Sequence, residues 1–142
     1  MKIVLDTNVL VAGLLSPFGP CGEVVRMVSS GELTLCIDAR ILSEYSEVLH
    51  RSKLRFEKDK VAALIDYIEY RGQTVASSPL SKPLPDPDDE PFLEAALSGG
   101  IEYLVTGNHA HFPSDPCRGI KVLSPSDFLK HYRTKRKRKK HT

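Results

Sequence analysis

Short apolar runs alternate with segments of helical periodicity along most of this chain, and this alternation limits the folds that are open to it. Apolar runs typical of strands occupy residues 2–6, 33–37, 74–77, 101–107 and 119–123. Helical spacing, with caps or terminating glycines, is found over residues 22–31, 39–51, 57–72, 91–99 and 124–132. Strands that alternate with helices favour an α/β domain with a mostly parallel sheet.

Asp6 is a lone carboxylate in a long apolar stretch, KIVLDTNVLVAGLL at residues 2–15. A buried carboxylate costs several kcal/mol unless it is paired, hydrogen-bonded or bound to a cation. Parallel sheets bind ligands beyond the carboxyl ends of their strands, and Asp6 stands where the first predicted strand ends. We therefore expect Asp6 to bind a metal ion.

Other candidate site residues are expected near the same edge of the sheet. Asn108 follows a predicted strand, and the acidic cluster DPDDE at residues 86–90 opens the helix that leads into that strand. On the helix at 39–51, a rotation of about 100° per residue places Glu44 at the margin of the apolar face and Glu47 in solvent. Taken alone, Glu44 is typical of a boundary residue and the acidic cluster of a helix cap.

Several carboxylates in one cleft repel each other, by about 4 kcal/mol for a pair roughly 4 Å apart at an effective dielectric constant of about 20. A divalent cation reverses the sign of this interaction, and Mg²⁺ or Mn²⁺ prefers the oxygen ligands that carboxylates offer. Such ions can activate a water and stabilise the leaving oxygen of a phosphodiester. The pair His109 and His111 and the three cysteines match no zinc spacing, so a polar-loop role is favoured for the histidines.

The charge of the chain is divided between an acidic body and a basic end. Eight of the 20 Lys and Arg residues follow residue 129, which leaves residues 1–129 with 12 basic and 18 acidic side chains, a balance of −6. We expect one domain at residues 1–132. The basic tail at residues 133–142 repels itself and is expected to be disordered in isolation.

Four segments of the sequence resemble the PIN-domain ribonucleases, and among them the short prokaryotic toxins of VapC type. They are VLDTNVLVAGLL, ILSEYSEVLHRSKL, DPDDEPFLEAAL and YLVTGNHAHFP, which together cover most of residues 2–125 in the expected order. The resemblance implies a PIN-like three-layer α/β/α sandwich around a mostly parallel sheet. It also implies an endoribonuclease that depends on Mg²⁺ or Mn²⁺, hydrolyses phosphodiester bonds of RNA with a metal-activated water and serves as the toxin of a toxin–antitoxin system.

The resemblance further implies which residues bind the metal. The first acid of the family falls on Asp6, the second on Glu44 and the third on Asp89. These three are the predicted catalytic and metal-binding residues. Asp86 and Glu90 stand close enough in the sequence to compete for the third position.

The fourth acidic position of the family falls on Asn108, where many relatives have aspartate. An asparagine can orient a water or a phosphate but removes one negative charge, so we expect one tightly bound ion and a second recruited with the substrate. Thr7, Asn8 and Thr106 are candidates for orienting waters or phosphate oxygens, and each also suits a strand end or a helix start.

An acidic body needs a source of affinity for RNA, and the basic tail is the candidate. Its predicted RNA-binding residues are Lys135, Arg136, Lys137, Arg138, Lys139 and Lys140. The family often dimerises and is often silenced by a partner protein, so a homodimer and a cognate antitoxin are candidate partners. No apolar segment reaches the roughly 20 residues of a membrane span, and the protein is expected in the cytoplasm.

Other functions fit parts of this pattern. The main alternative is a non-catalytic PIN-like module that binds RNA or a partner, in which Asn108 marks a decayed site. A Mg²⁺-dependent phosphatase with Asp6 as covalent nucleophile is weakened by Asn8, because that chemistry suits a second aspartate two residues on. A DNA-directed nuclease of the same architecture also stays open.

Overall fold

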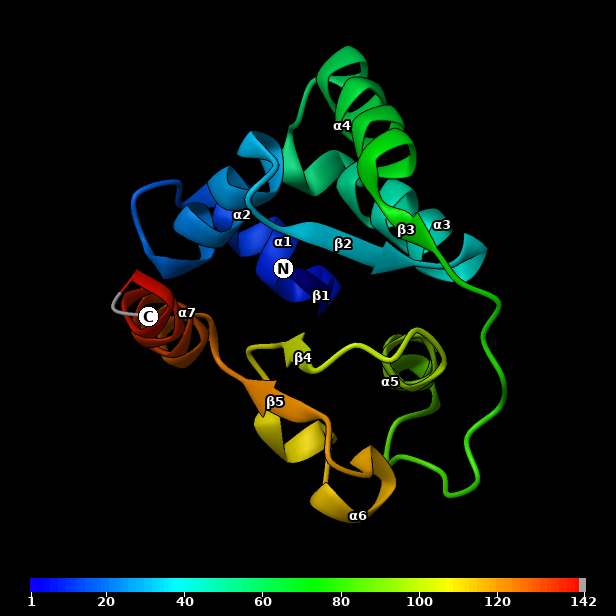
Figure 1. The fold of residues 1–142 in the computed structure, drawn as a ribbon. Coiled ribbons are helices and arrows are strands. Elements are labelled where there is room, and N and C mark those ends of the chain that lie inside the picture. The colour runs from blue at the N-terminus through cyan, green and yellow to red at the C-terminus, as the bar shows by residue number, and fades with distance from the viewer. Residues whose placement is uncertain (141–142) are drawn as a thin grey trace.

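The fold is built around a parallel sheet of five short strands. In chain order they are β1 (Lys2–Leu5), β2 (Thr34–Ile37), β3 (Gln73–Thr74), β4 (Tyr103–Val105) and β5 (Lys121–Leu123). The computed structural model describes residues 1–140, with side chains through Arg138. The strands lie in the order β3-β2-β1-β4-β5, and each pairs in parallel with its neighbours (Figure 1). This arrangement confirms the predicted α/β fold.

The three central strands are buried on both faces of the sheet, which explains why they read as continuous apolar runs rather than alternating ones. Ile3, Leu5, Leu35 and Leu104 are each 2 % exposed or less. The edge strand β3 has two residues, and β5 is only partly buried. The core therefore centres on β1, whose carboxyl end leads directly into Asp6.

Helices cover both faces of the sheet. They are α1 (Thr7–Leu15), α2 (Pro20–Ser30), α3 (Ala39–Leu49), α4 (Lys58–Arg71), α5 (Glu90–Ser98), α6 (Ser114–Cys117) and α7 (Pro125–Lys140), with 3-10 turns η1 (Ser52–Leu54), η2 (Pro87–Asp89) and η3 (His109–His111). In Figure 1, α2 and α7 lie on one side of the sheet and α3 and α5 on the other, which gives the three layers of an α/β/α sandwich. Within the described part of the chain, no single helix has both the length and the apolar character needed to cross a membrane; only α1 and α2 together do, and they meet at a bend of 100°.

Helix α1 was not among the predicted helices, because its sequence TNVLVAGLL is apolar on nearly every side and shows no helical period. The structure shows that α1 packs closely against α2. A Cβ atom on Gly13 would lie 2.5 Å from the Val25 side chain and 2.6 Å from the carbonyl oxygen of Cys21. The two helices therefore approach at a distance that only glycine permits, and this contact covers the side of α1 that carries Gly13.

Arg40 links two buried carboxylates that belong to different helices. Its guanidinium nitrogens lie 2.8 Å from Asp38 Oδ2 and 2.7 Å from Glu94 Oε1. Asp38 also caps α3, and Glu94, on α5, accepts a hydrogen bond from the Leu80 N–H at 3.0 Å. The network thus fastens the proline-rich segment between β3 and η2 against the two helices.

Replacing Arg40 by alanine is expected to lower the free energy of unfolding by about 1–3 kcal/mol, because Asp38 and Glu94 would be left buried without a cation. Burial alone would raise the pKa of Asp38, but hydrogen bonds from Arg40, the Ile41 N–H and Ser77 hold that pKa below 3.8. This stabilisation is present above pH 3.8 and is lost as the pH falls through the lowered folded-state pKa.

Urea unfolding at neutral pH and in acid measures this effect, and the difference between wild type and Arg40→Ala should shrink in acid. Arg138→Ala is the control, since Arg138 is exposed and has no ion-pair partner among the described residues. Its effect should stay within about 0.5 kcal/mol. Equal losses for the two variants would contradict the role given to Arg40.

Helix α7 continues through the basic end of the chain to Lys140, which differs from the disordered tail expected from residue 133 onward. Ion pairs with the acidic body offset the mutual repulsion of the cations. They are Arg133–Glu23 at 2.6 Å, Lys135–Glu102 at 3.2 Å and Arg136–Glu32 at 3.2 Å. The expectation considered the tail alone and did not include these acidic partners. Residues 141 and 142 of the predicted tail lie outside the described residues.

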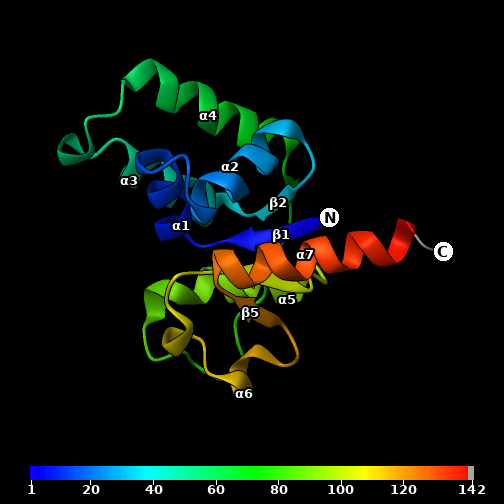
Figure 2. The same cartoon turned by 90° about the vertical axis from the view of Figure 1, so that its left-hand side faces the viewer.

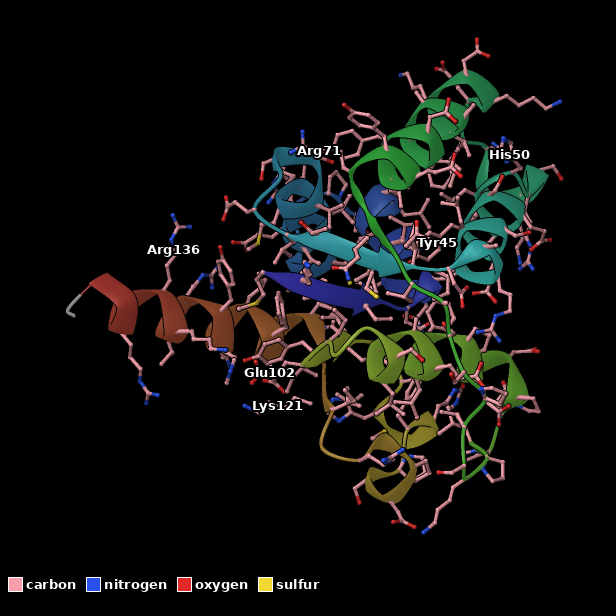
Figure 3. The ribbon with its side chains drawn as sticks, turned by 45° about the vertical axis from the view of Figure 1, so that its right-hand side comes forward. Tyr45, His50, Arg71, Glu102, Lys121 and Arg136 are labelled. Carbon is pink, nitrogen blue, oxygen red and sulfur yellow. The ribbon has the colours of Figure 1, made fainter. Side chains whose placement is uncertain are left out.

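The basic part of α7 lies at the amino ends of the strands. Glu32 and Glu102, which pair with α7, stand shortly before β2 and β4. Figure 2 shows α7 running past the N-terminus of β1. In Figure 3, Glu102 and Arg136 lie toward that end of the molecule, away from Tyr45 on α3. Lys135 and Arg136, two of the predicted RNA-binding cations, are therefore separated from Asp6 by the length of the sheet.

Candidate metal centre

Asp6 lies at the point where the strand order reverses. The chain leaves β1 toward β2 and β3 and later returns to β4 on the other side of β1, and parallel sheets bind ligands at such a point. Asp6 follows β1 and Thr106 follows β4, and the Asp6 N–H donates to the carbonyl oxygen of Val105 at 2.9 Å. Asp6 is 6 % exposed and accepts a hydrogen bond from Thr106 Oγ1 at 2.7 Å.

The Asp6 carboxylate is costly to ionise without a cation. Burial raises its pKa above 3.8, the negative charge of Asp89 adds to this effect, and the hydrogen bond from Thr106 opposes it. Asp6 precedes α1, yet its side chain makes no capping hydrogen bond to that helix. Its charge lies both at the start of α1 and at the carboxyl edge of the sheet, where it is available for a ligand.

Glu44 reaches the same edge from α3. It is half-buried, whereas Glu47 is exposed and pairs with Arg51 at 2.9 Å, so the predicted placement of these two acids on the helix is confirmed. Thr7 Oγ1 donates a hydrogen bond to Glu44 Oε2. The neighbouring Tyr45 is fully buried, and its hydroxyl donates to the carbonyl oxygen of Leu5 at 2.5 Å, which ties α3 to the end of β1 (Figure 3).

Asp89 stands at the end of η2, where its side chain does not cap α5. Instead, Asp89 Oδ2 lies 3.0 Å from His111 Nδ1. Burial raises the pKa of Asp89, the charge of Asp86 raises it further and His111 lowers it. One ligand atom from each of Asp86, Asp89 and His111 lies within 4.8 Å of the others, so these three form a compact group that can hold a metal ion.

The three predicted acids come from separate elements and sense one another electrostatically. The charge of Asp89 raises the pKa of Asp6, and the charge of Glu44 raises that of Asp89. Asp6 and Glu44 nevertheless stand outside the compact group of Asp86, Asp89 and His111. Hard carboxylate oxygens, with one imidazole nitrogen, suit a divalent cation, and mutual repulsion is what such an ion would relieve.

Three polar residues near the acids hold them in place. Thr106 binds Asp6, Thr7 binds Glu44, and Asn8 donates to Asp6 Oδ2 at 3.4 Å while accepting from the Gly107 N–H at 3.4 Å. The sequence left these residues between orienting waters and serving as helix-start or strand-end residues. In the structure, each of the three donates a hydrogen bond to a carboxylate.

Glu90 and Asn108 differ from the three acids. Glu90 Oε2 accepts a hydrogen bond from the Leu84 N–H at 3.0 Å, so this carboxylate holds the proline-rich segment. Asn108 is exposed, and its side chain makes no hydrogen bond within residues 1–140. Its backbone N–H donates to Thr106 Oγ1 at 3.1 Å, which supports the residue that holds Asp6.

His111 is the residue that sequence reasoning missed. The polar-loop interpretation gave it no part in the site, whereas η3 brings His111 Nδ1 to 3.0 Å from Asp89 Oδ2. The sequence did contain a signal for its place near the acids. His111 lies three residues after Asn108, which follows a predicted strand at the edge where the site was expected. Spacing rules for zinc sites do not weigh that position, because they compare histidines and cysteines only with each other.

An open groove of about 500 Å³ adjoins this edge between α1 and α3, and we call it the α1–α3 groove. Its lining consists of Asp6, Thr7, Asn8, Val11, Ala12, Leu15, Glu44, Val48, Arg51, Lys53 and Leu54. Two predicted ligands, Asp6 and Glu44, therefore share a groove with five apolar residues and the two cations Arg51 and Lys53. The predicted RNA-binding residues of α7 line no part of it, and the side chains of Lys139 and Lys140 lie outside the described residues.

The sequence model of a family described as the PIN domain matches residues 2–110. This range includes Asp6, Glu44, Asp89 and Asn108 but ends just before His111. No curated protein matches the chain.

Proposed function

The chain belongs to the PIN-domain family, whose members are generally nucleases, and we propose that it is an endoribonuclease that depends on Mg²⁺ or Mn²⁺. The observation that carries the proposal is Asp6, a buried carboxylate whose pKa is raised by burial and by the charge of Asp89. We further propose that the protein acts in the cytoplasm as the toxin of a toxin–antitoxin pair. The VapC-like features of the sequence support this role.

At the carboxyl ends of the strands, neighbouring side chains hold the carboxylates of Asp6, Glu44 and Asp89 in an arrangement that suits phosphodiester hydrolysis. Thr106 and Thr7 hold Asp6 and Glu44, and the ring of His111 holds Asp89. When bound, a divalent ion supplies positive charge to the phosphodiester and lowers the pKa of a water. Without the ion, the ionised acids repel an RNA phosphate, so productive binding at this edge is expected to need the metal.

A cleavage assay with Glu44→Gln tests the proposal. Labelled single-stranded RNA, single-stranded DNA and a phosphomonoester are incubated with the protein in Mn²⁺ or in EDTA. We expect cleavage of RNA in Mn²⁺ only, and a loss of at least about 100-fold in Glu44→Gln, because the variant removes a metal ligand. Growth arrest on induced expression that Glu44→Gln relieves would support the toxin role.

Glu69→Gln is the matched control, because Glu69 is an exposed glutamate on α4 without an ion pair among the described residues. It should cleave RNA like the wild type. Cleavage that persists in EDTA, or in Glu44→Gln, would reject the metal-dependent mechanism. Hydrolysis of the phosphomonoester alone would favour a phosphatase, and preference for DNA would reject the assignment of RNA as substrate.

A further inference from the structure

The cations nearest to the candidate metal centre are not those of α7. Lys135 and Arg136 stand at the amino ends of the strands and are paired with Glu102 and Glu32. Arg51 and Lys53, in contrast, line the same α1–α3 groove as Asp6. A strand bound at the metal centre can therefore reach Arg51 and Lys53 directly, whereas it must extend across the molecule to reach α7.

The charges of Arg51 and Lys53 are available for a ligand. Lys53 is exposed and has no ion-pair partner within residues 1–140. Arg51 pairs with Glu47, but both side chains are close to half exposed or more, at 47 % and 61 %. Such surface pairs are worth about 0–1 kcal/mol, so a phosphate can replace Glu47 as the partner of Arg51.

The wall between the acids and these cations is apolar. It is formed by Val11 and Leu15 from α1, Val48 from α3 and Leu54 from η1. Leu15 is 54 % exposed, so its side chain offers apolar surface to a ligand. A volume of about 500 Å³ falls in the range of pockets that hold small organic ligands, and it accommodates a nucleotide.

The geometry points to a nucleotide-binding subsite for a single-stranded RNA. We propose that the α1–α3 groove holds the nucleotide next to the cleaved phosphodiester, with Lys53 and Arg51 binding backbone phosphates and the apolar wall packing against the base and ribose. This inference rests on the proposed ribonuclease function and adds the path of the substrate. Among the groove residues, Glu44, Val48 and Arg51 follow one another in the chain, so an acid, an apolar side chain and a cation occur in the order of a scissile phosphate, a nucleoside and the next phosphate.

The double variant Arg51→Ala/Lys53→Ala tests the subsite. Kinetics with single-stranded RNA in Mn²⁺ should show KM raised about tenfold at about 0.1 M salt, with kcat within about twofold, because two phosphate contacts are lost. Binding is measured separately by fluorescence anisotropy in Mn²⁺, in a Glu44→Gln background that does not cleave the RNA, with Arg51 and Lys53 either both intact or both replaced by alanine. The slope of log affinity against log salt should become shallower by about 1.4.

The matched control is Lys58→Ala/Lys60→Ala, which removes the same charge from exposed positions on α4 outside the groove. It should leave KM and the salt slope close to wild type. Equal effects of the two double variants would overturn the subsite and leave only a general effect of net charge. An unchanged KM and slope in Arg51→Ala/Lys53→Ala would also overturn it and would assign the groove to another occupant, such as an apolar peptide.

The failure of the subsite can be told apart from the failure of the proposed function. If wild-type protein cleaves RNA and the double variant behaves like its control, only the subsite is wrong. If wild-type protein cleaves no RNA, the ribonuclease proposal fails, and the anisotropy measurement still decides whether Arg51 and Lys53 bind a strand.

Discussion

An Asp6→Asn variant is expected to lose cleavage by roughly 100- to 1000-fold and, in the absence of metal, to melt at a higher temperature than the wild-type protein. Asparagine keeps an oxygen that accepts the hydrogen bond from Thr106, and it removes a charge that is buried to 6 % exposure. Activity and stability should therefore change in opposite directions. A substitution that merely damaged the fold would lower both.

The pH dependence of this stability gain follows from the raised pKa of Asp6, which is caused chiefly by burial. The folded protein binds a proton at Asp6 more tightly than the unfolded chain does, so ionisation lowers the free energy of unfolding. That loss begins as the pH rises above 3.8 and is complete above the raised folded-state pKa. The difference between Asp6→Asn and wild type should accordingly vanish in acid and be fully present at neutral pH.

Metal should reverse the order of the two proteins. At about 100 times its Kd, Mn²⁺ adds about 2.7 kcal/mol to the stability of a protein that binds it only when folded. Thermal melts in EDTA and in Mn²⁺ should show this gain for wild type and for Asp66→Asn, a control at an exposed aspartate on α4, but much less of it for Asp6→Asn. Equal stabilisation of wild type and Asp6→Asn would contradict a ligand role for Asp6.

Phe92→Ala is expected to lower the free energy of unfolding by about 3–5 kcal/mol, because it empties a fully packed position in the core. Phe92 is 1 % exposed and its ring centroid lies 6.5 Å from that of Tyr45. This ring pair joins α5, which begins beside Asp89, to α3, which carries Glu44. The variant should therefore also need more Mn²⁺ for cleavage, although it changes no acid.

Phe18→Ala is the matched control, since the same side chain is removed from a position that is 97 % exposed. Its free energy of unfolding should stay within about 0.5 kcal/mol of wild type. Because Phe92→Ala can unfold a marginal protein, Phe92→Leu provides a milder test with the same direction. Similar denaturation midpoints for the two alanine variants would contradict the packing role of Phe92.

Local patterns predicted much of the fold because most elements have an interior side and a solvent side, or are buried throughout. The α3 segment shows this clearly: its apolar stripe placed Glu44 at the margin and Glu47 in water, as the structure has them. Helix α1 could not be predicted in this way, because a sequence that is apolar on nearly every side does not indicate which face of a helix is buried. The length of α7 could not be predicted either, since its cations pair with residues far away in the sequence. Two of these partners, Glu23 and Glu32, lie more than a hundred residues earlier.

The candidate site was predictable where it depends on strand ends and less so where it depends on loops. Asp6 could be placed at the carboxyl edge from the parallel arrangement alone. The contact of Asp89 with His111 joins residues 22 apart through η2 and η3, two short turns that have no periodic signal. Likewise, Glu90 has a structural role because it accepts a hydrogen bond from the Leu84 N–H, which lies in a segment rich in prolines.

The hydrogen bond from Thr106 to Asp6 spans 100 residues, and this has a consequence for protein synthesis. A nascent chain that stops before β4 has made Asp6 and Glu44 but has neither Thr106 nor the pairing partner of β1 on that side. The acidic edge is thus finished only when most of the polypeptide has left the ribosome. Premature termination before β4 therefore yields fragments without a completed centre.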